Sequence, residues 1–524
     1  MSSKTRVLFV YPNERQMSVI PPAIAIMSQL LKDNGHVTGL FDTSFYEFED
    51  NISVGDSDKQ QTESLQARPI TDKDDDDLHF SKINTDPAAD LRKKITEFSP
   101  DLLAVSCTET TFLRGLRLIS KTRDMGIRNI FGGVFPTFAP QLVMNYEVVD
   151  MCCVGDGENA IIDLADCLSR GEDHSDVTNL WVRKKNGTIK KNPLTKPVDL
   201  NQLPSITDMG LFDDKRFYRP MGGKIRRLLP VETHRGCPYT CSFCNSPSQN
   251  RLYAGNGSFF RKKSIKMVKA EIESHIKAWK AEYIYFWADT FLAWSPKEFD
   301  EFCEMYQDIK LPFWMQTRPE TLSEEKVKRL ADVGLHRISF GVEHGNEEFR
   351  KKYLGRSFKN KDIIEKLKIP HSYGVQFSVN NITGFPHETR ELAFDTIELN
   401  KNIQSDNQNL YAFVPFHGTP LRKICEELGY VKHEDITRCL TDKPMLDQPQ
   451  YSAEEVEGLQ RCFVLYVGMP KSRWKDIAKA EKNTPEGNRI FAELKEEYTR
   501  DYMNDSAGEK VADLEYGVES TDGE

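Results

Sequence analysis

Short apolar runs alternate with helix-like segments through the first 170 residues of the chain. Apolar runs that end at polar or glycine-rich turns are typical of buried strands. The predicted strands are 6–11, 37–42, 101–107, 128–131 and 151–155, and the predicted helices are 23–32, 87–98, 112–125 and a segment from Glu158. This alternation predicts an α/β domain with a parallel, doubly wound (Rossmann-like) sheet.

The same alternation returns in the middle of the chain. The predicted strands there are 227–233, 283–287, 312–316, 337–341, 375–379 and 409–414, and the helical patterns are 264–281, 296–308, 323–333, 360–371 and 388–402. Six strands that alternate with helices predict a partial (β/α)6 barrel. In such barrels the chemistry takes place at the carboxyl ends of the strands.

These patterns divide the chain into five parts. We expect a first domain over 1–195, a proline-containing linker over 196–221, the barrel over 222–422, a helical C-terminal region over 423–502 and a disordered tail over 503–524. Residues 43–86 interrupt the first domain with an acidic run and little periodicity, which predicts a flexible insertion.

Composition narrows the class of protein. The chain has 524 residues, of which 39% are hydrophobic, enough for two or three domains with proper cores. It contains no apolar run of about 18 residues and no signal-peptide pattern, so we expect no membrane span and a cytoplasmic location. A net charge of -10 without a long basic block argues against a nucleic-acid partner. The 11 cysteines, an odd number, are expected to be free thiols.

Three of these cysteines form the densest chemical motif. Cys237, Cys241 and Cys244 are spaced C-x3-C-x2-C, directly after a predicted strand and a turn at Gly236. Thiolates are soft ligands that suit iron–sulfur clusters and zinc. A fully ligated 4Fe–4S cluster takes four cysteines, so three leave one iron with an open position. His234, three residues before Cys237, leaves open a closed structural zinc site of one histidine and three cysteines.

Polar or glycine-rich segments follow the other barrel strands. Asp289, Arg318 and Glu343 each come after a strand, as do residues 383–388 and 415–420. Together with the cysteine motif, and in this order, they resemble the strand-end motifs of the radical S-adenosylmethionine (SAM) superfamily over about 225–425. The resemblance implies a 4Fe–4S cluster on Cys237, Cys241 and Cys244, whose free iron chelates the amino and carboxylate groups of SAM.

The resemblance also implies a role for each strand-end residue. Glu343 would bind the ribose hydroxyls or amino end of SAM, Asp289 would lie near the amino group, and Arg318 would pair with the carboxylate. The Gly384 loop would pass the adenine, with Phe243 beside it. Taken singly, an acidic residue after a strand is usually a helix cap. For Arg318, the alternative to binding SAM is an ordinary ion pair on the protein surface. His344, His387 and His417 are candidate bases near the barrel mouth, but no catalytic residue is assigned.

The first domain resembles the cobalamin-binding domain that precedes many radical SAM enzymes. The resemblance spans 6–169 and rests on the order of elements, on Pro21-Pro22 and on two loops that would hold the corrin: Gly132, Gly133, Pro136 and Thr137 in one, and Gly155, Asp156, Gly157 and Glu158 in the other. The alternative is a flavodoxin-like domain without a corrin. The motif Asp-x-His-x-x-Gly is absent, so no histidine is expected on cobalt, and the lower neighbour would come from around Thr108.

The combined resemblance implies a cobalamin-dependent (class B type) radical SAM enzyme. Its simplest activity is that of a methyltransferase, which modifies an unactivated carbon of a small molecule through a 5′-deoxyadenosyl radical. A radical cyclisation or rearrangement on the same scaffold is the alternative. A zinc-stabilised binding module is a third possibility, which iron and sulfide content would distinguish. An electron donor such as flavodoxin or ferredoxin is the implied protein partner. Residues 423–502 do not indicate the substrate.

Overall fold

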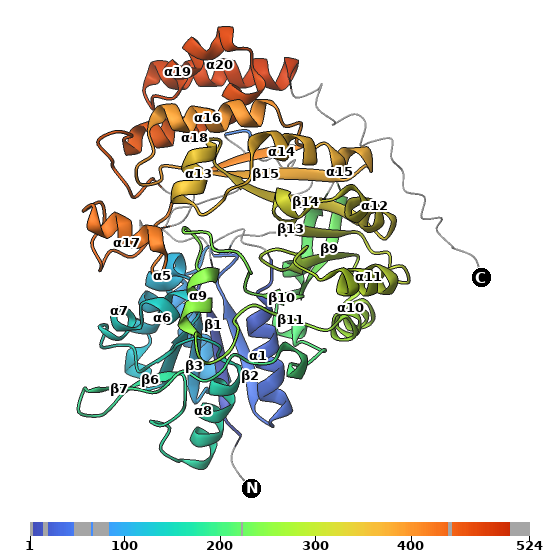
Figure 1. Ribbon diagram of the computed structural model, residues 1–524. Helices are drawn as coiled ribbons and strands as arrows, with labels where there is room; N and C mark the ends of the chain where they lie inside the picture. Colours follow the sequence, from blue (N-terminus) through green and yellow to red (C-terminus); the bar gives the residue numbers. More distant parts are fainter. Residues whose placement is uncertain are drawn as a thin grey trace.

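The computed structural model describes residues 4–13, 19–46, 64–66, 83–221, 224–438 and 443–502. Most of the expected insertion and the whole expected tail lie outside these residues. Two seven-stranded sheets with their helices stack on each other, the N-terminal one below and the barrel above (Figure 1). In the part of the chain that the structure describes, no helix is long and apolar enough to cross a membrane.

The lower sheet has the strand order β2-β1-β3-β4-β5-β6-β7. Its first five strands are parallel, which confirms the doubly wound prediction: β1 (Arg6–Tyr11), β2 (Val37–Asp42), β3 (Leu102–Ser106), β4 (Arg128–Gly132) and β5 (Met151–Cys153). The edge strands β6 (Leu180–Arg183) and β7 (Ile189–Lys191) are antiparallel and were not predicted, because they are short and partly polar.

Alternation along β1 shows why helices cover both faces of this sheet. Val7 and Phe9 belong to one hydrophobic cluster, and Leu8 and Val10 to another. The first face packs against α1 (Pro22–Asp33) and α8 (Glu158–Arg170), and the second against α4 (Pro87–Phe98) and α5 (Glu109–Ser120). A strand that is buried on both sides reads as a continuous apolar run, which is the pattern in the sequence.

The upper sheet has the order β16-β15-β14-β13-β12-β9-β8. Six strands are parallel and confirm the partial barrel: β9 (Lys224–Glu232), β12 (Tyr283–Trp287), β13 (Phe313–Thr317), β14 (Leu335–Glu343), β15 (Gln376–Thr383) and β16 (Asn407–Ala412). The outer helices are α10 (Ile265–Trp279), α11 (Pro296–Tyr306), α12 (Glu324–Asp332), α14 (Asn360–Lys366), α15 (Ile369–Ser372) and α16 (Arg390–Lys401). An antiparallel edge strand, β8 (Tyr218–Met221), comes from the segment that was expected to be linker.

One hydrophobic cluster joins the two sheets. It runs from Phe9 of β1 through Met209 and Phe217, which precede β8, to Ile284 and Phe286 of β12. The segment between the domains is therefore packed into the core, and it holds the domains in one arrangement.

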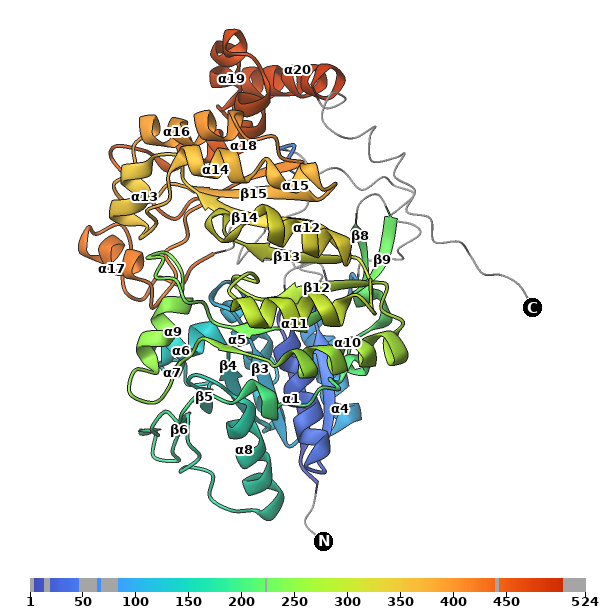
Figure 2. The same ribbon diagram turned by 45° about the vertical axis from the view of Figure 1, so that its right-hand side comes forward.

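The C-terminal region is helical, as predicted, and covers the open edge of the barrel (Figures 1 and 2). It contains α17 (Pro420–Glu427), α18 (Ala453–Gly468), α19 (Trp474–Ala480) and α20 (Pro485–Asp501). Helix α18 packs against β16 and α16. Gln66, from the segment that interrupts the first domain, accepts a hydrogen bond from the Leu410 amide at 3.0 Å and donates one to the Gln460 carbonyl at 3.0 Å.

Candidate functional site

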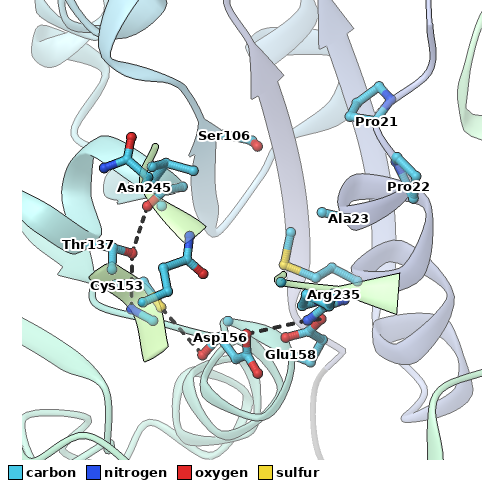
Figure 3. Close-up of a pocket in the computed structure, with 18 of the residues that line it drawn as sticks. Pro21, Pro22, Ala23, Ser106, Thr137, Cys153, Asp156, Glu158, Arg235 and Asn245 are labelled. Carbon is cyan, nitrogen blue, oxygen red and sulfur yellow. Dashed lines mark hydrogen bonds and ion pairs between the residues drawn. The ribbon is translucent and has the colours of Figure 1, made fainter. Parts of the chain in front are cut away.

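A cavity of about 650 Å³ lies between the two domains. In parallel sheets the ligand-binding loops lie at the carboxyl ends of the strands. Here the carboxyl ends of the strands of both sheets face this cavity. Figure 3 shows part of its wall, with residues from the start of α1 and from the ends of β3, β4 and β5. The lining residues include Pro21, Pro22, Ala23, Ser106, Gly132, Gly133, Thr137 and 155–158 from the first domain, and Glu232, Arg235, Phe243, Cys244, Asn245 and Asp289 from the barrel.

The two loops that line the cavity on the first domain contribute four glycines, Gly132, Gly133, Gly155 and Gly157. Gly133 has a φ of +124°, and a Cβ there would lie 2.1 Å from the Cys107 carbonyl oxygen. Gly155 has a φ of +82°, and a Cβ there would lie 2.3 Å from the Tyr253 hydroxyl. Thr137 joins the two loops, because its Oγ1 donates to the Gly133 carbonyl at 2.8 Å and accepts from the Gly155 amide at 3.1 Å. Glycines at these positions leave room for a large ligand such as a corrin to approach the backbone closely.

Two of the residues expected to hold the corrin do not line this cavity. Thr108, the N-cap of α5, is exposed, and Pro136 is buried in α6 (Val134–Phe138). Ser106, at the end of β3, does line the cavity, although sequence reasoning did not single it out. Its position at a strand end was the available signal. The Thr108 assignment stays a prediction.

The three cysteines of the motif lie in the loop after β9, beyond the turn at Gly236. Cys237 and Cys241 are buried, and Cys244 faces the cavity. The three sulfur atoms do not form a group in which all lie within 4.8 Å of one another. Four ligands around one zinc ion, each with a Zn–S bond of about 2.3 Å, would place sulfurs about 3.8 Å apart. At least one pair of these sulfurs is therefore farther apart than a single zinc ion allows, as in a cluster in which each cysteine binds its own iron.

His234 does not complete a zinc site with these cysteines. Its ring centroid lies 4.1 Å from that of Trp294, and its Nδ1 lies 2.8 Å from Thr233 Oγ1. Burial lowers the pKa of His234 to about 3, so the ring is neutral at physiological pH. The zinc interpretation of the motif is therefore not supported by the geometry.

Charged and polar groups surround the thiols. Arg318 Nη1 and Arg356 Nε each lie 3.4 Å from Cys241 Sγ, to which they donate, and Thr290 Oγ1 lies 3.3 Å from Cys237 Sγ. Burial raises the pKa of Cys244 to about 12 and also raises that of Cys237. The Cys237 and Cys244 thiols are therefore protonated at neutral pH until a metal displaces the protons.

The residues expected at SAM fall into two groups. Asp289 and Phe243 line the cavity beside Cys244. Asp289 accepts a hydrogen bond from Ser246 Oγ at 2.6 Å, and burial raises its pKa. Arg318 and Glu343 lie around Cys241 instead: Arg318 Nε donates to Glu320 Oε1 at 2.7 Å, and the Arg318 guanidinium lies 3.8 Å from the centroid of the Tyr239 ring.

Glu343 is held by an arginine that sequence reasoning missed. Arg356 Nη2 lies 3.3 Å from Glu343 Oε1, and Arg356 Nη1 donates to the Gly341 carbonyl at 2.6 Å. Glu343 has a φ of +74°, a strained conformation of the kind that concentrates at functional sites. Burial raises the pKa of Glu343. Arg356 gave no signal because it follows a helix, α13 (Glu347–Tyr353), and not a barrel strand.

Gly384 lies apart from both groups, and it does not line the cavity. Its amide donates to Glu388 Oε2 at 2.6 Å, and its carbonyl accepts from Gln448 of the C-terminal region at 3.0 Å. His344 Nε2 lies 3.1 Å from the same Glu388 side chain, and both are fully buried. His387 is exposed.

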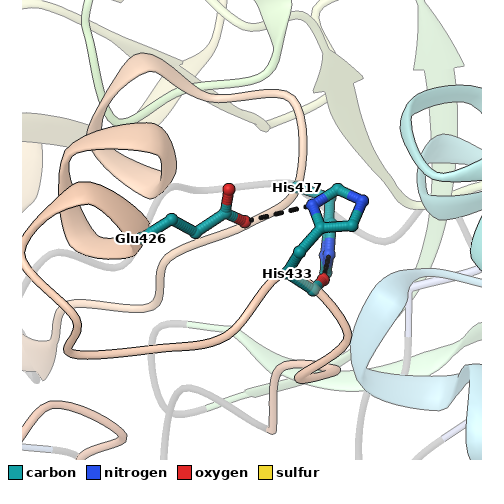
Figure 4. Close-up of side chains that lie close together, drawn as sticks. All are labelled: His417, Glu426 and His433. Carbon is teal, nitrogen blue, oxygen red and sulfur yellow. Dashed lines mark hydrogen bonds and ion pairs between the residues drawn. The ribbon is translucent and has the colours of Figure 1, made fainter.

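His417, Glu426 and His433 form the one group of possible metal ligands that the described residues bring together (Figure 4). Both ring nitrogens of His417 already have partners: Nδ1 lies 2.6 Å from Glu109 Oε1, and Nε2 lies 2.8 Å from the His433 carbonyl oxygen. Arg422 Nε donates to Glu426 Oε1 at 2.8 Å and brings a positive charge. The arrangement thus acts as a contact between domains, and it provides no open metal site. None of the three histidines proposed as bases lines the cavity.

Two family profiles match the chain. The profile described as the Radical SAM superfamily matches residues 231–399, which include the cysteine motif and the strands from β12 to β15. The profile described as the B12 binding domain matches residues 67–165, which include β3, β4 and β5. Both matches coincide with the sides of the cavity that the two domains contribute.

Several known proteins are similar to this chain over both domains. An uncharacterized methyltransferase of Pyrococcus horikoshii is 26% identical over 410 residues, 77% of this chain and 84% of the relative. The anaerobic magnesium-protoporphyrin IX monomethyl ester cyclase of Rubrivivax gelatinosus is 26% identical over 354 residues, 65% of this chain and 60% of that enzyme. The structure of the radical SAM methyltransferase TsrM from Kitasatospora setae, with cobalamin and a [4Fe-4S] cluster bound, has a TM-score of 0.62 at 16% identity and covers 95% of this chain and 100% of that one. At this identity the likeness is one of fold.

Proposed function

We propose that this chain, which belongs to the cobalamin-dependent radical SAM enzymes, is a methyltransferase that modifies an unactivated carbon of a small molecule. The observation that carries the proposal is the single cavity in which the glycine loops after β4 and β5 face Cys244 and Asp289. A radical abstraction alone needs no second cofactor domain. Methyl transfer uses both sides of this cavity.

The chain's own residues bind and orient the cofactors and exclude water. When bound, the cluster, SAM and cobalamin supply a hydrogen-abstracting radical and a transferable methyl group. We propose that Glu343 and Arg318, near Cys241, bind the amino and carboxylate groups of SAM, and that Phe243 packs beside the adenine. Because burial raises the pKa of Glu343, a bound ammonium group stabilises its charged form.

The test follows the methyl group and both SAM-derived products. Anaerobically reconstituted protein receives methyl-labelled SAM, a reductant and a small-molecule extract of the source cells. We expect label in a new product, with S-adenosylhomocysteine and 5′-deoxyadenosine formed in comparable amounts. If 5′-deoxyadenosine forms without label transfer, methylation is wrong. The cyclase of Rubrivivax gelatinosus, 26% identical to this chain, makes radical cyclisation the next candidate.

We further propose that a flavodoxin or ferredoxin supplies the electron in a reducing, cytoplasmic environment. The ten cysteines that the structure describes are all free thiols, which suits such an environment. Replacing dithionite with reduced flavodoxin or ferredoxin should sustain turnover. If the protein turns over with dithionite but with neither reduced flavodoxin nor reduced ferredoxin, these carriers are not the donor.

A further inference from the structure

A cluster of buried ion pairs joins the 155–158 turn of the first domain to the strand that leads into the cysteine loop. Strand β10 (His234–Arg235) pairs antiparallel with β11 (Arg261–Lys262), and this register sets Arg235 opposite Arg261. Both guanidiniums reach across the domain boundary to the turn. Figure 3 shows Arg235 beside Asp156 and Glu158.

Arg235 lies at the centre of this cluster. Its Nη1 lies 2.6 Å from Glu158 Oε1 and 3.4 Å from Asp156 Oδ1. Its Nε and Nη2 bind the two carboxylate oxygens of Glu232, the last residue of β9, at 2.9 and 3.0 Å. One planar guanidinium therefore connects a barrel strand to the turn after β5, in the forked geometry that only arginine offers.

Other barrel residues hold the same turn. Arg261 Nη1 lies 2.7 Å from Asp156 Oδ2, and the Asp156 amide donates to the Tyr253 hydroxyl at 2.7 Å. That hydroxyl is also the atom a Cβ at Gly155 would meet at 2.3 Å. The turn thus fits against the barrel through charge, backbone hydrogen bonding and shape.

The cluster is both buried and charged. The side chains of Arg235, Asp156 and Glu158 are 15%, 6% and 5% exposed. Burial disfavours the charged carboxylates, but Arg235 and Arg261 outweigh it and hold the pKa of Asp156 below its usual value. Removing one partner from such a cluster leaves a buried charge uncompensated, which is costly. The ion pairs therefore resist displacement of one domain relative to the other.

We propose that Arg235 is a positioning residue that sets the separation between the corrin-binding loops and the cluster. Arg235 is two residues from Cys237, and the turn that it holds supplies Gly155 and Gly157 to the corrin side of the cavity. Since the carboxylates of Asp156 and Glu158 are engaged by arginines, the turn meets the corrin with its backbone. The proposal rests on the proposed function only in that both cofactors bind, and not on the reaction type.

The test measures the separation directly in the full-length chain, reconstituted with cluster and cobalamin. Pulsed paramagnetic resonance gives the distance between Co(II) of cobalamin and the reduced cluster, and equilibrium dialysis gives cobalamin affinity. In Arg235→Gln we expect a longer, broader distance distribution and about tenfold weaker cobalamin binding, since buried charges lose their partner. Arg235→Lys, which keeps the charge without the fork, should be intermediate.

The matched control is Arg92→Gln, which breaks an exposed ion pair with Asp124 inside the first domain and should change neither quantity. An unchanged distance and unchanged cobalamin affinity in Arg235→Gln would overturn the proposal. If that variant misfolds or loses iron, Glu158→Gln replaces it, because it leaves Arg235 bound to Glu232. An unchanged distance in Glu158→Gln also overturns the proposal. In the unaltered protein, absence of methyl transfer with both cofactors bound counts against the proposed reaction and leaves the positioning role of Arg235 standing.

Discussion

Two guanidiniums meet at the sulfur of one cysteine in this protein. Arg318 and Arg356 both donate to Cys241 Sγ at 3.4 Å, and each also holds a carboxylate, Glu320 and Glu343 respectively. Positive charge and hydrogen bonds to a sulfur ligand stabilise the more negative, reduced state of a cluster. At the scale of single residues, Arg318 and Arg356 should therefore raise the midpoint potential of the cluster.

Replacing Arg356 with Gln should therefore make the midpoint potential of the cluster more negative. If a hydrogen bond to a charged group is taken as about 1.5 kcal/mol, the shift is at most about 65 mV for one electron. A redox titration followed by paramagnetic resonance measures it. Arg329→Gln, which removes a partly exposed ion pair between Arg329 of α12 and Asp300 of α11, is the control and should leave the potential unchanged.

The cysteine assignment has a simple chemical test. Replacing Cys237, Cys241 and Cys244 together with Ala should lower iron from about four atoms per chain to nearly none, because no thiolate ligands of the motif remain. Cys303→Ala, at a buried cysteine of the hydrophobic core, should keep full iron content. Elemental analysis after anaerobic reconstitution measures the iron and zinc content of each protein. Zinc in place of iron in the unaltered protein would contradict the assignment.

Glu343 should contribute to SAM affinity. Glu343→Gln should weaken binding by about 1–3 kcal/mol, the range for a lost charged hydrogen bond, whereas Glu348→Gln, at an exposed position on α13, should have no effect. Because burial raises the pKa of Glu343, affinity should fall as the pH is lowered through that raised value and the carboxylate gains a proton. Isothermal titration at several pH values measures both effects. Equal affinity of the Gln variant would exclude Glu343 from the site.

At the scale of elements, the turn after β5 depends on a backbone conformation that side chains rarely adopt. Gly155 and Gly187 have nearly the same φ, +82° and +81°, but only Gly155 faces close neighbours, Tyr253 and Leu194. A Cβ at Gly187 would meet nothing within 4 Å. The two glycines therefore separate backbone strain from steric clash.

Gly155→Ala should weaken cobalamin binding by tenfold or more, because the displaced turn no longer closes the corrin side of the cavity. Gly187→Ala should cost only about 1–2 kcal/mol of stability from left-handed strain and should leave cobalamin affinity unchanged. Equilibrium dialysis and thermal unfolding measure the two quantities. Unaltered cobalamin binding in Gly155→Ala would argue against this turn as part of the corrin site.

At the scale of the whole molecule, polar contacts across the domain boundary add to the shared hydrophobic cluster. Glu109, the first residue of α5, accepts from the His417 amide at 2.9 Å and from the Thr437 amide at 3.0 Å, besides its contact with the His417 ring. It therefore ties the loop after β16 and the C-terminal region to the first domain. The two domains should unfold together.

Buried histidines should make the stability of the whole protein depend on pH. Burial lowers the pKa of His234 to about 3 and that of His275 to about 4. The unfolded chain, with histidine near 6.5, binds protons that the folded chain does not. The contribution of these two histidines to the free energy of unfolding is therefore fully present above about pH 6.5. It falls as the pH decreases from there towards 4, by about 1.4 kcal/mol per pH unit for each histidine.

Thermal unfolding between pH 7.5 and 4.5 measures this dependence. His275→Gln should flatten the slope of Tm against pH, whatever its effect at pH 7.5, because one depressed group is removed. His387→Gln, at an exposed position, should leave the slope unchanged. A slope that His275→Gln does not alter would show that other groups control the acid sensitivity.

Local patterns in the sequence determined the two parallel sheets, their order in the chain and the cysteine motif. A buried strand needs an unbroken apolar run, as in 6–11, and an amphipathic helix needs its own period, so both can be read without knowing what lies opposite. The spacing of Cys237, Cys241 and Cys244 is likewise local. These features were sufficient to predict the fold class and the family.

Only the tertiary structure decided which residues share a site. It placed Asp289 in the cavity but Arg318 and Glu343 around Cys241, brought in Arg356 from the end of a helix, and turned Glu158 towards Arg235, 77 positions further along the chain. It also added the edge strands β6, β7 and β8. Contacts between distant segments leave no period in the sequence, because they depend on how the chain packs and on which buried charges find a partner.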